Sequence, residues 1–235
     1  MYRYFARIPE AGKFTFLDSG WMDEITGDVL QGKLDDKGYA SRIDSVKRFE
    51  RQLRTTGYLV MKFFFHIDEK EQRKRLDALL VNKDTSWRVS DSDRWQNKHY
   101  DKCLKVFDRY LDDTNVSTAP WYIVDAHSRK WAQLQVLEML CQGIDVALQN
   151  KSLLFRCCRI PSRWKNAELG EIALDKTIEE AEYQEELDKL QKRLGELHNR
   201  LYRKRVPVII AYEAGMRQER AAISNGSPGR WIPEL

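Results

Sequence analysis

Several features that would place this 235-residue chain in a common class are missing from its sequence. The four cysteines, Cys103, Cys141, Cys157 and Cys158, form no CxxC pair and show no spacing to histidine that suits a metal. This pattern favours buried free thiols over a zinc site or a disulfide scaffold. No apolar run approaches the roughly 18 residues that a membrane-spanning helix needs. The first residues contain no apolar segment and no cleavage site of the secretory type, so we expect a cytoplasmic protein without a membrane partner.

A strong charge of either sign is also missing. The chain has 40 basic and 36 acidic residues, which gives a net charge of +4 at pH 7. A mild basic excess suits an anionic ligand, whereas a nucleic-acid binder usually has a more one-sided charge, so we expect no nucleic acid as a partner. Nucleophile and metal motifs such as GxSxG and HExxH do not occur. What is present, 42% hydrophobic and 32% charged residues, is typical of a globular protein.

Apolar runs alternate with amphipathic stretches along the first 148 residues. The runs predict buried strands, and apolar residues at helical spacing between them predict helices. Such alternation is typical of an α/β fold with a parallel sheet. The expected strands cover 13–21, 58–67 and 121–126, and the expected helices cover 36–54, 69–81, 90 or 91 to about 111, and 130–148.

The C-terminal third has a different character. Residues 151–176 read as a linker, 177–205 as one long charged helix, and 206–213 as an apolar strand. Apolar residues in the helix follow spacings of 4, 3, 4, 3 and 4, which is an a/d seam. Two interpretations are open: a homo-oligomer through 183–201, or packing within the same domain. The seam consists of Tyr183, Leu187, Leu190, Leu194, Leu197 and Leu201.

Two groups of residues are candidates for chemistry. Asp18 follows an apolar strand, where a carboxylate can hold a metal beside phosphates, although many strand-end aspartates only form turns. Residues 73–105 are rich in cations, with Trp87, Trp95 and Tyr100 among them. These cations could converge on a polyanion or could form a solvated helix face, and we expect the aromatic residues to be core. His66 ends a strand and is expected to be a structural histidine.

Five blocks in order resemble the polyphosphate kinase type 2 family, whose two-domain members include polyphosphate:AMP phosphotransferases. The blocks are RIPEAGKFTFLDSGW (7–21), FERQLRTTGYLVMKFFFHIDEKEQRKRL (49–76), TSWRVSDSD (85–93), HYDKCLKVFDRYLDDT (99–114) and APWYIVDA (119–126). The resemblance implies a P-loop kinase-like three-layer sandwich with a parallel sheet and a helical lid at 69–114, here incomplete and followed by a long helix. It also implies phosphoryl transfer between polyphosphate and a nucleotide, AMP or ADP, with Mg²⁺.

The resemblance also assigns residues. Asp18 matches the carboxylate of the family's Asp-Arg-Ser-Trp motif, which makes it the catalytic and magnesium-binding candidate, although the motif reads Asp-Ser-Gly-Trp here. The arginine of the family's Ala-Arg-Leu is Gln133 in this chain. The expected polyphosphate- and nucleotide-binding residues are Arg73, Lys74, Arg88, Lys98, Arg129 and Lys130.

The same resemblance suggests how the chain is divided. Residues 1–150 would be a partial domain without its phosphate loop, and 206–213 would be the first strand of a second kinase domain. The tail at 214–235 reads as aberrant, because compatible codons in another frame could encode the family's loop. We therefore expect an impaired or inactive phosphotransferase. The alternatives are a non-catalytic module that binds polyphosphate or nucleotide or docks through its long helix, and a pseudogene product without a function.

Overall fold

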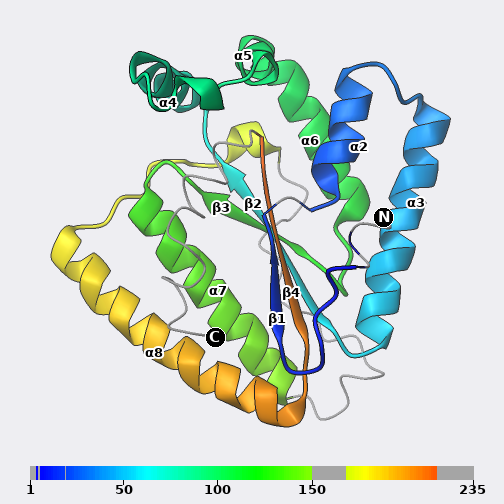
Figure 1. Cartoon of the computed structure of the whole chain (residues 1–235), viewed down its shortest axis with the longest axis vertical. Helices are drawn as coiled ribbons and strands as arrows, with labels where there is room; N and C mark the ends of the chain where they lie inside the picture. The colour runs from blue at the N-terminus through cyan, green and yellow to red at the C-terminus, as the bar shows by residue number, and fades with distance from the viewer. Residues whose placement is uncertain (1–3, 5, 19, 150–167, 216–235) are drawn as a thin grey trace.

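The computed structural model describes residues 4, 6–18, 20–149 and 168–215 (Figure 1). Most of the expected linker, with Cys157 and Cys158, lies outside the described residues, and so does the tail from 216 to 235. None of the helices in the described part is long and apolar enough to cross a membrane.

The strands of the described chain form one parallel sheet with the order β1-β4-β2-β3. Every residue of the two central strands, β2 and β4, is buried. Continuous apolar runs suit such strands, because both faces of a parallel sheet are covered. The strands are β1 Phe14–Leu17, β2 Leu59–His66, β3 Trp121–Asp125 and β4 Val208–Ala214.

Helices cover both faces of this sheet, as Figure 1 shows. Helices α2, α3 and α6 pack on one face, and α7 and α8 pack on the other. The predicted fold class, a three-layer α/β sandwich with a helical lid, is therefore confirmed. The helices are α2 Met22–Leu30, α3 Asp36–Thr55, α4 Glu69–Val81, α5 Asp91–Lys98, α6 Tyr100–Thr114, α7 Arg129–Gln149 and α8 Glu180–Lys204, with short turns η1 Ser86–Arg88 and η2 Leu169–Glu171.

Two of the lid helices, α4 and α5, begin where local side chains satisfy free amide groups. Asp68 accepts a hydrogen bond from the amide of Glu71 and caps α4, as the sequence predicts. Ser90 and Asp93 form a reciprocal capping box at α5. The single helix expected from residue 90 or 91 to about 111 is wrong, because the chain breaks at His99. Its ring Nδ1 bonds to the carbonyl of Trp95 at 2.8 Å, and its backbone leaves the helical region.

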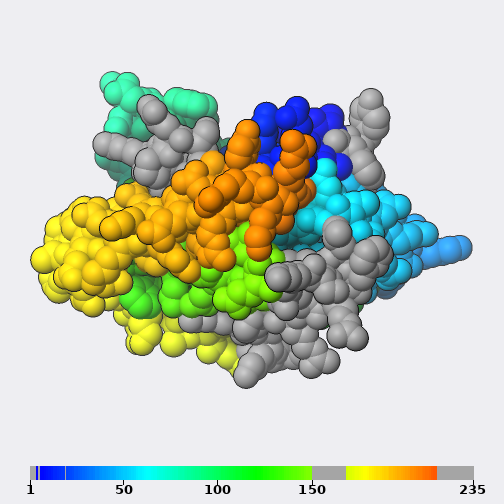
Figure 2. Space-filling model, turned by 90° about the horizontal axis from the view of Figure 1, so that it is seen from below, coloured from blue at the N-terminus to red at the C-terminus, as the bar shows by residue number. Residues whose placement is uncertain are grey.

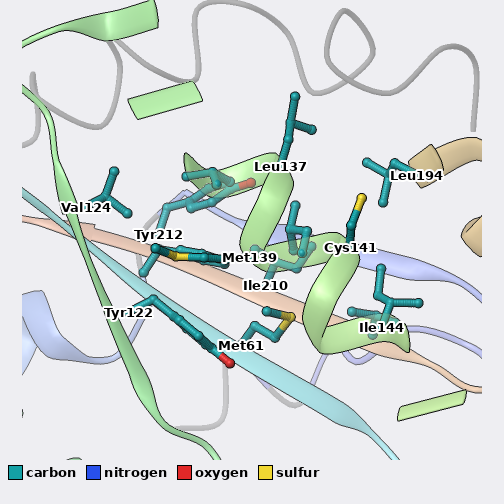
Figure 3. Close-up of a cluster of buried hydrophobic side chains, with 14 of the residues drawn as sticks. Met61, Tyr122, Val124, Leu137, Met139, Cys141, Ile144, Leu194, Ile210 and Tyr212 are labelled. Carbon is teal, nitrogen blue, oxygen red and sulfur yellow. The ribbon is translucent and has the colours of Figure 1, made fainter. Parts of the chain in front are cut away.

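The core between the sheet and α7–α8 is formed by large apolar side chains (Figure 3). Met61 of β2, Tyr122 of β3 and Ile210 of β4 face Ile144 of α7 and Leu194 of α8. The last three leucines of the seam, Leu194, Leu197 and Leu201, are buried in this core. The seam therefore packs against α7 of the same chain. Figure 2 shows α8 lying along α7 on this side of the molecule. Packing within the domain is thus the interpretation that the structure supports.

The last strand differs most from the sequence-based expectation. The segment expected to open a second domain forms β4, which lies between β1 and β2 in the same sheet. Val208 aligns with Phe14 on one side and with Leu59 on the other. The physical reason is that a strand apolar on both faces is stable only with both faces covered and its backbone groups paired.

One ion pair is buried in the core between the sheet and α3. Lys62 Nζ lies 3.0 Å from Glu50 Oε1, and both side chains are fully buried. The same ammonium group donates to the carbonyl of Thr114, and Trp21 donates to Glu50. Burial raises the pKa of Glu50 and lowers that of Lys62, while the attraction between the two charges opposes both shifts. Such a pair favours one packing arrangement of β2 against α3, since losing either partner leaves a buried charge.

Candidate functional site

The ends of all the strands in the described sheet meet at one edge. Because β1 to β4 are parallel, their carboxyl ends lie together, and α4 and α5 rise above this edge (Figure 1). In open α/β sheets, ligands bind at this edge. Asp18, Asp68 and His127 follow three of the strands directly or within two residues. The carboxyl edge is therefore the candidate functional site.

Asp18 lies at this edge just after β1, with an exposed side chain. Burial raises the pKa of Tyr212 on the neighbouring β4, and the negative charge of Asp18 adds to this shift. In the described chain, no three side chains of His, Cys, Asp or Glu are grouped so that they could hold a metal by themselves. A lone carboxylate still suits Mg²⁺, which commonly takes one or two carboxylates together with substrate phosphates and water.

The residues after Asp18 explain one departure from the family motif. Glu213 of β4 is buried, and its Oε1 accepts a hydrogen bond from the amide of Met22 at 3.0 Å, at the start of α2. A side chain at Gly20 would collide with this same carboxylate oxygen. Glycine at position 20 therefore lets Glu213 approach the N-terminus of α2, where a negative charge is favourable.

Two of the predicted cations lie on the first lid helix. Arg73 binds Glu69 one turn earlier and donates from Nε to Asn97 Oδ1 of α5 at 3.2 Å. Lys74 Nζ lies 3.2 Å from Glu71, and its side chain is 78% exposed. Exposed ion pairs of this kind are weak, so a polyanion could replace the carboxylates as partner.

The other two lid cations lie further along the lid. Arg88 is in η1, with its guanidinium 5.5 Å from the ring centre of Trp87, and Lys98 is exposed at the end of α5. The expectation that the lid aromatics are core is wrong for Trp87, which is 75% exposed, and for Trp95, which is 37% exposed. Short helices with few buried positions leave these rings at the surface. Tyr100 is partly buried and donates to the carbonyl of Ile67 at 2.7 Å.

The remaining predicted cations, Arg129 and Lys130, begin α7 after β3. Arg129 is exposed, whereas Lys130 forms an ion pair with Glu180 at the start of α8. The Lys130 ammonium also lies 5.9 Å from the ring centre of Tyr183. The predicted cation at position 130 is thus held by α8 in this structure.

Gln133, one turn further along α7, also contacts α8. Its Oε1 accepts a hydrogen bond of 2.6 Å from the hydroxyl of Tyr183. An arginine in this position, as in the family's Ala-Arg-Leu motif, has no acceptor for that hydroxyl. The departure from the motif therefore matches the docking of α8 on α7.

The predicted residues do not all meet at one point. Asp18 follows β1 and Arg129 follows β3, which are the outer strands of the described sheet. Three strand spacings separate these strands, which corresponds to roughly 14 Å. Helix α4, which carries Arg73 and Lys74, in contrast contacts the loop that leads into α7 and the Arg129–Lys130 pair.

That contact involves residues that sequence reasoning did not single out. Arg75 of α4 donates to the carbonyls of Ala126 and His127, at 2.8 and 2.9 Å. The His127 ring lies between two carboxylates, with Nε2 3.2 Å from Asp68 and Nδ1 3.5 Å from Asp125. The sequence offers one clue to His127, because this histidine directly follows the Asp125-Ala126 pair at the end of a predicted strand. Its partner Asp68 could not be identified in the same way, since it is 59 residues away in the sequence.

His66 at the end of β2 is a structural residue, as expected. Its Nε2 lies 3.0 Å from the carbonyl of Leu169, and the ring is buried. Burial lowers the pKa of His66 to about 4, partly offset by the hydrogen bond to Leu169. Leu169 is itself fully buried, so this part of the expected linker is packed against the domain.

A small recess opens beneath the lid beside these residues. It is lined by the end of β2, by α5 and α6, and by Gly215 after β4, and its polar lining includes His66, Gln72 and Tyr100. None of the predicted cations lines it. The recess therefore does not coincide with the predicted phosphate-binding residues.

One stretch imitates a phosphate loop in sequence but not in structure. Residues 27–33 read GDVLQGK, which matches GxxxxGK but is followed by Leu34 in place of serine or threonine. A phosphate loop lies between a strand and a helix. Gly27 lies inside α2, and Gly32 follows the end of that helix with a φ of 68°. This stretch is therefore a helix end.

Comparison with known proteins gives the same assignment across these elements. The family model for polyphosphate kinase 2 (PPK2) matches residues 1–152, which include β1 to β3 and the lid. A polyphosphate:AMP phosphotransferase of Pseudomonas aeruginosa is 28% identical over 200 residues, covering 83% of this chain and 40% of that protein. A polyphosphate:AMP phosphotransferase of Pseudomonas syringae is 29% identical over 148 residues, covering 63% of this chain and 30% of the relative.

An ADP-polyphosphate phosphotransferase of Pseudomonas aeruginosa is 26% identical over 140 residues, which cover 60% of this chain and 46% of that protein. The chain thus spans less than half the length of these relatives. The family match covers well over half of the chain, and together with the parallel sheet and the lid it shows that this chain belongs to the polyphosphate kinase 2 family.

Proposed function

We propose that this chain takes part in phosphoryl transfer between polyphosphate and an adenine nucleotide, AMP or ADP. The observation that carries the proposal is the family match over residues 1–152, which includes the lid, the strand ends and the loop before α7. The relatives named above act on polyphosphate with AMP or ADP according to their names. The cations at the edge and on the lid suit such substrates, because phosphoryl transfer depends on positioning and on neutralising charge.

The cations divide into two groups in this proposal. Arg73, Lys74, Arg88 and Lys98 approach polyphosphate from the lid, and Arg129 and Lys130 approach it from the edge of the sheet. Arginine binds two phosphate oxygens at once, while lysine acts as a mobile point charge. Phosphate oxygens would replace Glu69, Glu71 and Glu180 as partners of these cations.

Asp18 is the proposed catalytic carboxylate and would hold Mg²⁺ together with substrate phosphates. Its exposed position at the end of β1 leaves it open to such an ion. When bound, Mg²⁺ would neutralise charge on the phosphoryl group that is transferred. The sequence contains no run that satisfies GxxxxGK[ST]. Since the amides and lysine of that loop hold the phosphates, we expect the 235-residue chain itself to bind polyphosphate but to transfer little phosphate to AMP.

Titration of the purified chain with polyphosphate of defined length tests the binding. We expect charge reversal at Arg73, Arg88 or Lys98 to weaken binding by about tenfold each, since a hydrogen bond to a charged group is lost. The matched control is Arg51→Glu, an exposed arginine near the end of α3 that leads to the opposite edge of the sheet. Equal losses in all four variants would show attraction to net charge only and would contradict a lid site.

A second candidate function is a non-catalytic binding or interaction module. The engagement of Lys130 and Gln133 by α8 favours it, because residues at two family motif positions serve to hold a helix. An assay of phosphate transfer from polyphosphate to AMP distinguishes the two. Turnover that is slow but lost in Asp18→Ala supports the enzyme, whereas binding with no turnover above that of Asp18→Ala supports the module.

A further inference from the structure

The lid is joined to the edge of the sheet by one arginine. Arg75 Nη2 donates to the carbonyls of Ala126 and His127, and Nε donates to Glu71 Oε1 at 2.8 Å. The side chain is only 14% exposed. Two of its hydrogen bonds thus link α4 to the loop at residues 126–128, which leads into α7, and the third holds the side chain to Glu71 of its own helix.

A histidine in that loop makes a second link in the opposite direction. The ring of His127 reaches from the loop to Asp68, the residue that caps α4. On its other side, Asp125 Oδ1 lies 3.5 Å from the ring and accepts the backbone amide of His127 at 3.0 Å. The ring is therefore held between the end of β3 and the start of the lid.

We propose that Arg75 and His127 form a clasp that positions the lid against the edge loop. The clasp, defined as these two residues with Asp68 and Glu71, lies between the two groups of proposed phosphate-binding cations. It fixes the spacing between Arg73 and Lys74 on α4 and the Arg129–Lys130 pair two and three residues beyond His127. The inference rests on the proposed function, because it gives that spacing a purpose: a polyphosphate chain held from both sides.

The reason is preorganisation. A polyanion that bridges two mobile elements must order both of them on binding, and that cost is subtracted from its affinity. A clasp that orders them beforehand removes this cost without touching the ligand. Arg75 is accordingly a positioning residue, with Nε and Nη2 engaged by the protein. Its Nη1 is buried without a hydrogen-bond partner among the described residues, so direct contact with phosphate is the competing explanation.

Substitution of Arg75 by lysine separates the two explanations. Arg75→Lys keeps the positive charge, but one ammonium cannot reach Glu71 and both carbonyls in the planar fork geometry. We expect polyphosphate binding about fivefold weaker than wild type, which corresponds to one lost hydrogen bond. The control is Lys70→Gln, which removes a charge from the exposed side of the same helix and should change affinity by less than about twofold.

Amide hydrogen exchange without ligand measures the clasp directly. In Arg75→Lys and in His127→Ala, exchange in α4 and at residues 126–128 should rise together, and Lys70→Gln should leave both unchanged. If Arg75→Lys does not fold, hydrogen exchange in His127→Ala alone shows whether the clasp couples α4 to the loop. The proposal is overturned if α4 and the loop exchange independently, or if Arg75→Lys binds polyphosphate as tightly as wild type. Wild-type protein that binds no polyphosphate would overturn the proposed function instead, and hydrogen exchange alone would then judge the clasp.

Discussion

His66 lies at the end of β2 with its ring buried against the carbonyl of Leu169. Its pKa falls from an ordinary 6.5 to about 4 in the folded protein, mainly because burial disfavours the charged ring. Between these two values the unfolded chain binds a proton that the folded chain does not. The contribution of the neutral His66 ring to the free energy of unfolding is therefore fully present above pH 6.5. It is lost as the pH falls towards 4, and the loss amounts to roughly 3 kcal/mol.

Urea unfolding at several pH values checks this contribution. We expect His66→Gln to show a smaller loss of unfolding free energy between pH 6.5 and 4 than wild type, because the titrating ring is gone. His198→Gln is the control: burial also lowers the pKa of this ring, but the ring is only partly buried, so we expect its removal to change the pH dependence less. An unchanged pH dependence in His66→Gln would contradict the assigned burial.

The position of a single residue was predictable where the residue lies at or soon after the end of a predicted strand. Asp18 and the Arg129–Lys130 pair follow strands, so their position at the carboxyl edge followed from the strand pattern. Arg75 and His127 were not predictable as partners, because 52 residues and a whole lid separate them in the sequence. The exposure of Trp87 was missed for a related reason: local sequence does not show how few neighbours a short turn provides.

At the scale of elements, the docking of α8 on α7 has a measurable consequence. Leu194 is 1% exposed and packs in the core between the sheet and these helices. We expect Leu194→Asp to lower the free energy of unfolding by about 3 kcal/mol or more, since it removes apolar contacts and buries a charge. Denaturant unfolding followed by circular dichroism measures the change.

The control for this substitution introduces the same residue on the outer side of the same helix. Lys192 is exposed, and Lys192→Asp should cost less than about 0.5 kcal/mol. Light scattering across protein concentrations completes the test. If Leu194→Asp halves the mass of the particle and leaves the protomer stable, the seam joins two chains and the packing on α7 is wrong.

Periodicity predicted most elements and failed where tertiary contacts decide. The helices α3, α4 and α7 and the strands β2 and β3 formed close to their expected bounds. The break between α5 and α6 arises from the conformation of His99, which apolar spacing does not reveal. Helix α2 was not predicted, and its amide group at Met22 is satisfied by Glu213 from the other end of the chain.

At the scale of the whole molecule, the sheet is completed by β4, which comes last in sequence among the strands of the described residues. The run at 206–213 was readable as a strand, but its neighbours were not, because strand order depends on contacts between residues nearly 200 positions apart. We infer that the described residues up to the end of α7 form one cooperative kinase-like domain with β4, and that α8 brings β4 back to the centre of the sheet.

Introducing a charge into the middle of β4 tests this unity. Ile210 is fully buried, and its register partners are Phe16 of β1 and Met61 of β2. Ile210→Asp places an unpaired carboxylate in the apolar core between the sheet and helices α7 and α8, and should cost more than about 4 kcal/mol. Because β4 joins β1 to β2, we expect the amides of both neighbouring strands to lose protection from hydrogen exchange together.

Tyr202→Asp is the control for this substitution. It lies at an exposed position near the end of α8 and should leave that protection intact. If the amides of β2 and β3 stay protected in Ile210→Asp, the segment belongs to a separate unit and the central place of β4 is refuted.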